Sequence, residues 1–512
     1  MRLTTGLGFV AAFVGAMALS ASAPAPAASD SAEQRAARFF ESIRRSPPEE
    51  WAFLREMPKG GDLHNHLSGA VYAESYLRWA VDAGLCLEAR TFVLSAPPCD
   101  PKRDQALLSA DLADASRDVY GEAIDAWSMR NWTPSHQSGH DHFFDTFGKF
   151  GLAGSGKTGA MLAEVAARAA RGRVSYLELM ITPDSGRAAA AGLAAGWSGD
   201  ADATLGVLAP NLVSAAAEAA SALRAAEADK NQRLGCGTPT PDPGCAVTVR
   251  WIYQVLRAIP LPSVFAQLAL GFRLASDPAS LVVGLNMVQP EDSPASMANF
   301  GAEMRMIQAL RARYPRAHVT LHAGELAPGL VPPEGLSFHI RDSVEIAGAE
   351  RIGHGVDVMH ETDATGLLDE MAARRVLVEI CLTSNAVILG VSGRDHPLAM
   401  YLRHGVPVAL ATDDEGVARA DLPAEFVRAA DDQQLGYQDL KAMARASLEF
   451  AFLPGSSLWR DPRRFAPVAE CSGGALGQPT PPAACQAFLD RSEKARLQWD
   501  LERQFGAFEK KF

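Results

Sequence analysis

Eight short apolar runs, separated by Ala-rich stretches of helical periodicity, constrain the fold more than any other feature of this sequence. Such alternation indicates parallel strands, because each parallel pair needs a long crossover connection that a helix usually provides. Eight units favour an α/β fold closed into a (β/α)8 barrel of the TIM type, with a doubly wound open sheet as the competitor. The predicted strands are Asp62–Leu67, Val174–Ile181, Val247–Val255, Leu281–Val288, His318–His322, Arg351–Val356, Val376–Thr383 and Val406–Thr412.

Two segments rich in Ala, Gly, Pro and Asp interrupt this pattern, at about residues 86–142 and 188–245, and we interpret them as insertions. The barrel itself is predicted to span residues 59–453. A helical segment precedes it at 24–58, and a loop followed by a charged helix completes the chain at 454–512.

The first 23 residues are typical of a secretory signal peptide. Arg2 precedes the apolar run Gly6–Leu19, and Ala21-Ser22-Ala23 supplies small residues for cleavage. The apolar run is shorter than the roughly 20 residues of a spanning helix. We therefore expect an exported protein, periplasmic or secreted, with no stable membrane anchor.

Six of the seven cysteines lie in local pairs around Pro- or Gly-rich loops: Cys86 with Cys99, Cys236 with Cys245, and Cys471 with Cys485. Short loops of this kind are readily closed by disulfides in an oxidising compartment, which agrees with export. Cys381 stands in the apolar run Val376–Leu382 and is expected to be buried.

The net charge of the chain indicates which kind of molecule it can bind. Lys and Arg number 48 against 60 Asp and Glu, a net charge of −12, which disfavours a nucleic-acid partner and leaves small molecules. The oligomeric state is left open.

Polar residues follow several of the predicted strands. The first strand carries His64 and His66, which share a face because alternate strand residues point the same way. Three later strands carry His322 with Glu325, His354, and the pair Asp413-Asp414. Because the carboxyl ends of barrel strands converge on one mouth, these side chains are expected to meet there.

Three imidazoles and one carboxylate suit one Zn²⁺ per chain, held by His64, His66, His322 and Asp413. Glu325, His354 and Asp414 remain beside the metal as acid–base groups, which is the inventory of metal-assisted hydrolysis. Each of these sequence patterns alone is weak evidence for a metal site, since a His-x-His pair or an Asp-Asp pair is usually accidental. The prediction rests on their occurrence together at several strand ends.

Three other features receive structural interpretations. The segment Gly151–Thr158 matches the phosphate-loop pattern but lacks a preceding apolar strand, so a Gly-rich turn before a helix is favoured. His136, His140 and His142 form a second cluster, either an insertion rim or another metal site. Glu178, on the second strand, is expected to form a structural ion pair.

Four short motifs resemble those of the adenosine deaminase family of the metal-dependent amidohydrolase superfamily. They are Pro58–Leu67, His322-Ala323-Gly324-Glu325, Arg351–Gly355 and Thr412-Asp413-Asp414, and the resemblance spans about Lys59 to Phe452. The export signal and Gly60-Gly61 are similar to the secreted, growth-factor-like branch, although that branch's long N-terminal dimerisation segment is missing.

The resemblance implies a hydrolase acting on the C–N bond of a cyclic amidine: adenosine or a related 6-aminopurine nucleoside reacts with water to give the inosine-type product and ammonia. It implies that Glu325 donates a proton to purine N1, that His354 orients and helps deprotonate the attacking water, and that Asp413 contacts this water. Asp414 would hydrogen-bond N7.

Two positions depart from the family pattern. Ser68 replaces an acidic residue at the ribose 5′ end, and Gln289 replaces a glycine whose N–H meets purine N3, so that its side chain would crowd the pocket. Two other functions stay open: a different amidohydrolase that cleaves cyclic amides or esters, and a secreted binding or signalling barrel without turnover.

Overall fold

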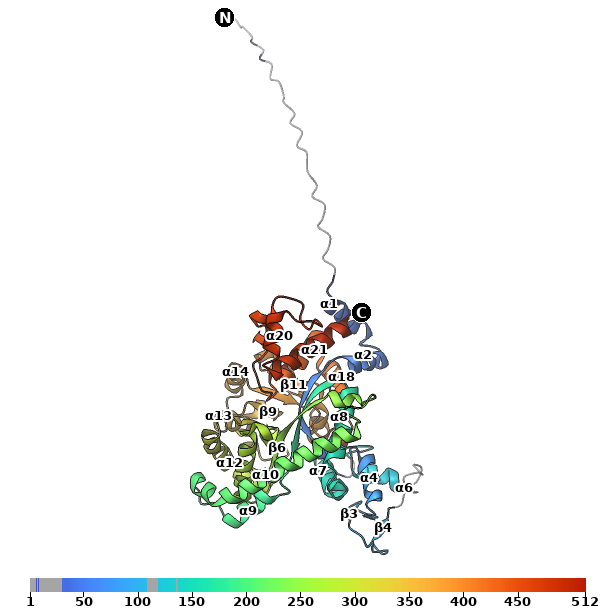
Figure 1. The fold of residues 1–512 in the computed structure, drawn as a ribbon, viewed down its shortest axis with the longest axis vertical. Coiled ribbons are helices and arrows are strands. Elements are labelled where there is room, and N and C mark those ends of the chain that lie inside the picture. The colour runs from blue at the N-terminus through green and yellow to red at the C-terminus, as the bar shows by residue number, and fades with distance from the viewer. Residues whose placement is uncertain (1–5, 7, 9–29, 108–117, 135–136) are drawn as a thin grey trace, which may run out of the picture.

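The computed structural model describes residues 6, 8, 30–107, 118–134 and 137–512 (Figure 1), so nearly all of the predicted signal peptide lies outside the described residues. Eight strands form one sheet in the order β1-β5-β6-β7-β8-β9-β10-β11, and all neighbouring pairs are parallel. The strands are β1 (Gly60–His66), β5 (Val174–Ile181), β6 (Thr248–Leu256), β7 (Val282–Val288), β8 (His318–Ala323), β9 (Arg351–His354), β10 (Leu377–Ile380) and β11 (Val408–Leu410). The predicted (β/α)8 barrel is confirmed, and each predicted strand overlaps an observed one.

The last strand returns to the first. Asn65 and Asp413 form a parallel bridge, in which the Asp413 N–H donates to the His64 carbonyl at 2.8 Å and the His66 N–H to the Asp413 carbonyl at 3.1 Å. This closure places the end of β1 beside the residues that follow β11.

Three predicted strands, Val376–Thr383, Arg351–Val356 and Val406–Thr412, run two or three residues past the observed carboxyl ends. The run Val376–Thr383 leaves the sheet at Ile380, because the helix α15 (Leu382–Leu389) starts almost at once. The run Arg351–Val356 stops at His354, where positive φ angles of 68° at His354 and 59° at Gly355 turn the chain. These apolar runs continue past their strands because the following turns are also buried.

Helices surround the sheet, as the alternating pattern predicts. Those of the barrel are α8 (Thr158–Arg171), α11 (Leu261–Ala275), α12 (Pro294–Arg313), α13 (His339–Glu345), α14 (Ala364–Arg374), α16 (Leu398–His404), α18 (Leu422–Gln433) and α19 (Tyr437–Glu449). The strands read as continuous apolar runs because such helices cover the outer face of a sheet whose inner face is also filled.

The insertions and the chain ends lie at opposite ends of the barrel (Figure 1). The first insertion holds α6 (Asp118–Ala126) and a small sheet of β2 (Cys86–Glu88), β3 (Leu94–Ser95) and β4 (Asp104–Ala106); the second holds α9 (Arg187–Ala195) and α10 (Ala201–Arg233). At the other end α1 (Ala32–Ile43) and α2 (Pro47–Glu56) meet the C-terminal α20 (Ala483–Leu489) and α21 (Glu493–Glu509). The C-terminal segment has more secondary structure than the predicted loop and single helix: it forms two helices and the hairpin of β12 (Trp459–Asp461) and β13 (Ala466–Pro467).

All three predicted disulfides are present, and Cys381 is a buried free thiol as expected.

By length and composition alone α10 could cross a membrane. It packs against α8, α9 and α11, and its buried residues, among them Leu205, Leu208, Leu212 and Leu223, recur at helical spacing. Packing on the barrel therefore accounts for much of its apolar character.

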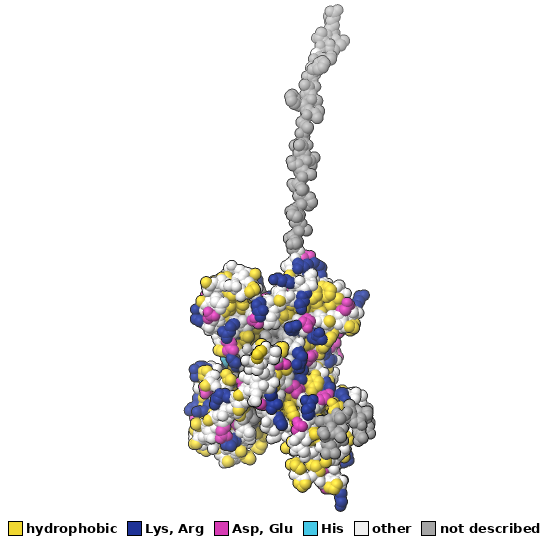
Figure 2. All heavy atoms as spheres, turned by 45° about the vertical axis from the view of Figure 1, so that its right-hand side comes forward, with side chains coloured by type: hydrophobic (Ala, Val, Ile, Leu, Met, Phe, Trp, Pro, Cys, Tyr) yellow, Lys and Arg dark blue, Asp and Glu magenta, His cyan; other side chains and the backbone are white. Residues whose placement is uncertain are grey.

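Acidic and basic side chains are interspersed on the face drawn in Figure 2. That face offers no broad basic surface of the kind that nucleic-acid binding requires.

Candidate active site

Four buried side chains meet at the carboxyl ends of the strands: His64 and His66 of β1, His322 of β8, and Asp413 after β11. We call these four residues the donor cluster. The Nε2 atom of His322 lies 3.1 Å from Nε2 of His64 and 3.3 Å from Nε2 of His66. Oδ1 of Asp413 lies 3.5 Å from the His64 Nε2 atom and 3.2 Å from that of His66.

These separations fit one tetrahedral zinc ion. Ligand atoms at about 2.0–2.1 Å from zinc, at the corners of a tetrahedron, are roughly 3.3–3.4 Å apart. Without a shared cation, imidazole nitrogens and a carboxylate crowded to this degree in a buried site would leave lone pairs facing one another. The donor set and its spacing therefore match the predicted metal ligands.

The far ring nitrogen of each imidazole has a partner on another strand of the barrel. Nδ1 of His64 lies 2.6 Å from Oε2 of Glu379, and Nδ1 of His322 lies 2.9 Å from Oδ1 of Asn286. Nδ1 of His66 lies 3.1 Å from Oε1 of Gln254. These oxygen acceptors fix the Nδ1–H tautomer and leave Nε2 free for a metal, as in other metal sites.

Glu379 is held ionised from the amino side of the barrel. Its Oε1 atom lies 2.6 Å from Nε of Arg351 and accepts from Thr320 Oγ1 at 2.9 Å. Burial alone would raise the pKa of Glu379, but Arg351 and the His64 hydrogen bond outweigh it and lower that pKa. Sequence reasoning missed Glu379, Asn286 and Gln254; the one available signal was a single polar residue inside an apolar strand.

Glu325 and His354 lie beside the donor cluster, with His354 Nε2 at 3.7 Å from Oε1 of Glu325 and 4.0 Å from Oδ2 of Asp413. Burial, with Asp413 and Glu291 nearby, raises the pKa of Glu325 well above its ordinary value, which favours the protonated carboxyl that a proton donor needs. Burial lowers the pKa of His354 to about 3, so its ring is neutral.

The amide of Asn385 donates to Nδ1 of His354 at 2.9 Å, and Oδ1 of Asn385 lies 3.0 Å from Nε2 of His396. A neutral His354 that accepts at Nδ1 carries its proton on Nε2, the atom that faces the site. Asp413 is also oriented, because Ser384 Oγ donates to its Oδ2 at 2.6 Å.

Asp414 points across the turn that follows β1. A Cβ at Gly69 would overlap its carboxyl group, so only glycine fits there. Burial raises the pKa of Asp414 to about 8, and its Oδ1 has no hydrogen-bond partner among the described residues. Ser68, the residue before Gly69, is exposed, and its carbonyl accepts from Tyr76 Oη at 2.7 Å.

Gln289 follows β7 with a φ of 82°, a value for which glycine is better suited. Its side-chain Oε1 accepts from the Ala258 N–H at 2.9 Å, which ties the side chain to the loop after β6. The expected crowding of the pocket by this side chain is thus limited by a bond to the barrel rim.

Within the part of the chain that the structure describes, the alternative sites do not assemble. The helix α7 (Gly139–Phe150), not a strand, precedes Gly151–Thr158, so this segment lacks the context of a phosphate loop. His140 pairs with Asp292 at 3.0 Å, whereas His142 contacts the Asp125 and Ser128 carbonyls. His136 lies outside the described residues.

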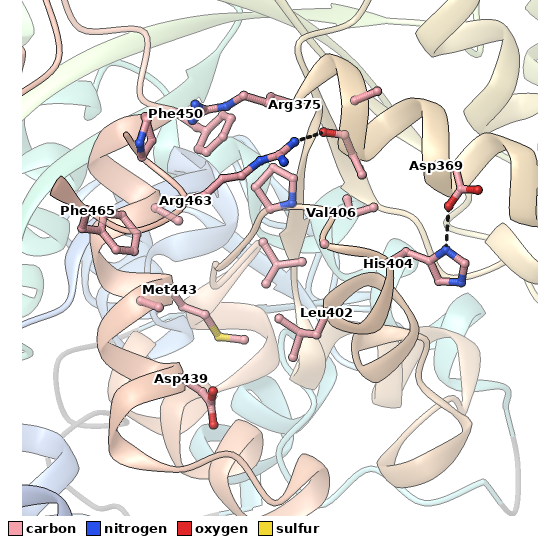
Figure 3. Close-up of a pocket in the computed structure, with 18 residues that line it drawn as sticks. Asp369, Arg375, Leu402, His404, Val406, Asp439, Met443, Phe450, Arg463 and Phe465 are labelled. Carbon is pink, nitrogen blue, oxygen red and sulfur yellow. Dashed lines mark hydrogen bonds and ion pairs between the residues drawn. The ribbon is translucent and has the colours of Figure 1, made fainter. Parts of the chain in front are cut away.

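A cavity of about 570 Å³ lies elsewhere, near the amino ends of β10 and β11 (Figure 3). Its walls include Leu402, Val406, Met443 and Phe450, and it contains none of the donor cluster. This cavity and the donor cluster are therefore at opposite ends of the barrel.

Comparison with known proteins agrees with this arrangement. The family model described as adenosine deaminase matches residues 138–458, more than half of the chain. The match begins beyond His64 and His66, so their place in the site rests on the geometry.

Two curated adenosine deaminases are similar over shorter segments. That of Vibrio cholerae serotype O1 is 39% identical over 140 residues, 27% of this chain and 39% of that protein. That of Salmonella typhi is 40% identical over 147 residues, 28% of this chain and 41% of that protein. The chain thus spans about two fifths of the length of these relatives.

The solved structure of Arabidopsis ADAL complexed with IMP has a similar fold, with a TM-score of 0.51 and 19% identity over 80% of this chain and 96% of that chain. An ADAL–IMP complex gives a TM-score of 0.50 with 20% identity, covering 79% of this chain and 94% of that one. These likenesses establish the fold, and the family match establishes the lineage. The chain belongs to the adenosine deaminase family of the amidohydrolase superfamily.

Proposed function

We propose that this protein deaminates adenosine or a related 6-aminopurine nucleoside hydrolytically, in a reaction that depends on one Zn²⁺ per chain. The observation that carries the proposal is the donor cluster with the Glu325 carboxyl and the His354 imidazole at its edge. Family membership and the names of the curated relatives support the same reaction.

His64, His66, His322 and Asp413 would hold the metal. Zn²⁺ supplies one piece of chemistry here, since it lowers the pKa of a water ligand to about 7 and so provides a nucleophile at neutral pH.

The remaining steps belong to side chains of this chain. Glu325 donates its proton to N1 of the purine, which makes C6 electrophilic. His354, with its proton on Nε2, orients the attacking oxygen, and the Asp413 carboxylate accepts a proton of the water as the C6–O bond forms. Asp413 passes this proton to the amino group, which leaves as ammonia when the C6–N bond breaks. The C6 hydroxyl returns a proton to Glu325, so that the product keeps N1–H and a C6 carbonyl.

Three further residues bind the substrate in this proposal. The ring nitrogen N7 is an acceptor, so Asp414 must be protonated to donate to it, and a pKa of about 8 provides that form at neutral pH. The backbone N–H of Gln289 meets N3, and Ser68 lies at the ribose 5′ end. A neutral Ser68 admits nucleosides and 5′-nucleotides alike, and IMP is the ligand named for the ADAL structures.

The test is an ultraviolet and ammonia-release assay of the zinc-loaded protein with adenosine, 2′-deoxyadenosine, AMP and adenine. We expect turnover of at least one of these 6-aminopurines. Zinc-loaded protein that releases no ammonia from any of them would contradict the proposal, and hydrolysis of cyclic amides or esters would then support a different amidohydrolase activity.

We also propose export, supported by three disulfides, which persist mainly in oxidising compartments. Protein recovered from the periplasm or medium should begin at Pro24, after Ala21-Ser22-Ala23. Full-length protein confined to the reducing cytoplasm would contradict export.

A further inference from the structure

We infer that Glu291, which lies beside the buried guanidinium of Arg257, is a positioning residue that holds the proton donor Glu325 in place. This inference rests on the proposed function, because it assigns Glu291 a task in the step that Glu325 performs. It concerns two buried residues outside the donor cluster.

The carboxylate of Glu291 accepts hydrogen bonds from the backbone N–H groups of Gly324 and Glu325. Oε1 accepts from the Gly324 N–H at 3.1 Å, and Oε2 accepts from the Glu325 N–H at 2.8 Å. Glu291 is only 2% exposed, so both bonds lie away from water, where bonds to an ionised acceptor are strong.

The carbonyl of Gly324 accepts from the Val356 and Asp357 N–H groups at 2.8 and 3.3 Å, so what Glu291 adds is the acceptor for the two N–H groups of this segment. β8 ends at Ala323, and the chain turns at Gly324 with a φ of 76°, so neither N–H belongs to the sheet ladder. Without Glu291 both donors would be buried and unpaired, which is unfavourable. The turn that aims Glu325 therefore depends on a side chain from the loop that follows the neighbouring strand β7.

Arg257 lies beside Glu291 and donates hydrogen bonds to the backbone around it. This fully buried guanidinium donates from Nε to the Gln289 carbonyl at 3.0 Å and from Nη1 to the His322 carbonyl at 3.2 Å. Its Nη2 lies 4.0 Å from Oε2 of Glu291. Arg257 thus joins the ends of β6, β7 and β8 and keeps a positive charge beside the buried carboxylate.

A nearby glutamate provides a matched control. Glu303 of α12 is also buried, and neither of its carboxyl oxygens has a hydrogen-bond partner among the described residues. Burial raises the pKa of Glu303 to about 8, and Arg257 is the charged group that opposes this rise. Glu303→Gln therefore changes a glutamate in the same region without touching the Gly324–Glu325 peptide.

The test measures kcat, KM and zinc content for Glu291→Gln, Glu291→Asp and Glu303→Gln. In Glu291→Gln one oxygen becomes an NH₂ group that cannot accept from a backbone N–H. We expect kcat to fall by about 10–100-fold, as small misplacements of a catalytic group do, with KM and zinc content near wild type. Glu291→Asp keeps the charge and should recover part of the rate, and Glu303→Gln should match wild type.

Two readouts separate positioning from a general structural role. In a Glu325→Gln background, Glu291→Gln should change kcat by less than about twofold, because its effect passes through Glu325. Amide hydrogen exchange at Gly324 and Glu325 should be faster in Glu291→Gln than in wild type, whatever the activity.

The same fold-loss of kcat in both backgrounds, unchanged kcat in Glu291→Gln, or unchanged exchange at these two amides would overturn the inference. Wild-type protein without deaminase activity would instead remove the proposed function, and the exchange measurement would still report whether Glu291 orders the turn.

Discussion

The two ends of the barrel treat buried charge differently. At the amino end Arg351 is joined to Glu178 Oε2 and Glu379 Oε1, both at 2.6 Å, and donates to the Phe450 carbonyl at 3.0 Å. At the carboxyl end His354 Nε2, Asp414 Oδ1 and Asn286 Nδ2 have no hydrogen-bond partner within the described part of the chain. Buried polar atoms are normally paired, so the three unpaired atoms at the carboxyl end are available to a ligand, whereas the ion pairs of Arg351 tie β5, β9 and β10 together.

Glu379 connects the two ends, since one carboxylate oxygen faces Arg351 and the other faces His64. The cavity of Figure 3 adds to the contrast: it lies at the amino end, with mainly apolar walls, where no donor cluster exists among the described residues. This cavity, taken alone, would therefore have pointed away from the donor cluster.

The largest expected effect is the loss of metal binding at the carboxyl end. His322→Ala removes one imidazole from the donor cluster, and zinc content should fall from about one per chain to near zero. Deaminase activity should fall by roughly 10⁴-fold or more, because the pKa of the attacking water returns toward 15.7. Metal analysis and the ammonia assay check this, with His142→Ala as the control; equal zinc content in both variants would contradict the assignment.

Glu325→Gln leaves the metal ligands intact but removes the proton donor. We expect zinc to stay bound while kcat falls by about 10²–10⁴-fold, the usual contribution of a general acid. Glu334→Gln, an exposed change on the loop that follows, should behave as wild type. Near-normal turnover in Glu325→Gln would show that another group protonates the purine.

A matched pair separates the two ends directly. Glu379→Gln should weaken zinc binding by about 10–100-fold and also lower the free energy of unfolding, since Arg351 loses a charged partner. Glu178→Gln touches only the amino-end network and should destabilise the protein by about 3 kcal/mol with zinc affinity unchanged. Competitive chelator titrations and denaturant unfolding give both quantities; equal zinc affinities in the two variants would erase the distinction.

The smallest expected effect tests whether an unpaired buried acid near the carboxyl end can affect stability without taking part in ligand binding. Glu303 is such an acid, with its pKa raised by burial from 4.5 to about 8. The folded protein then binds a proton that the unfolded chain has lost, so this contribution to stability is complete below about pH 4.5 and declines as pH rises to about 8.

Glu303→Gln cannot titrate, so its free energy of unfolding should fall less over this window, by up to about 1.4 kcal/mol per pH unit. Urea unfolding at pH 5 and pH 8 compares the two proteins. Parallel pH dependence of wild type and variant would mean that Glu303 is ionised when folded.

The sequence predicted the barrel and the donor cluster because both follow from spacing: apolar runs define strands, and His64, His66, His322 and Asp413 stand at their ends. It also placed Glu178 in an ion pair, now seen with Arg351. It could not distinguish Glu178 from Glu379, since both are lone acids in apolar strands. Whether such a residue faces Arg351 alone or also reaches a histidine depends on neighbours far away in the sequence. Glu291 and Arg257 were missed for the same reason.

The central claim, that four residues from both ends of the sequence share one zinc ion, is tested most directly by anomalous diffraction at the zinc edge from crystals of zinc-loaded protein. The account predicts one strong peak per chain, within about 2.0–2.2 Å of Nε2 of His64, His66 and His322 and of an Asp413 carboxylate oxygen. A peak beside His140 and Asp292, or no peak within bonding distance of these four side chains, would contradict it.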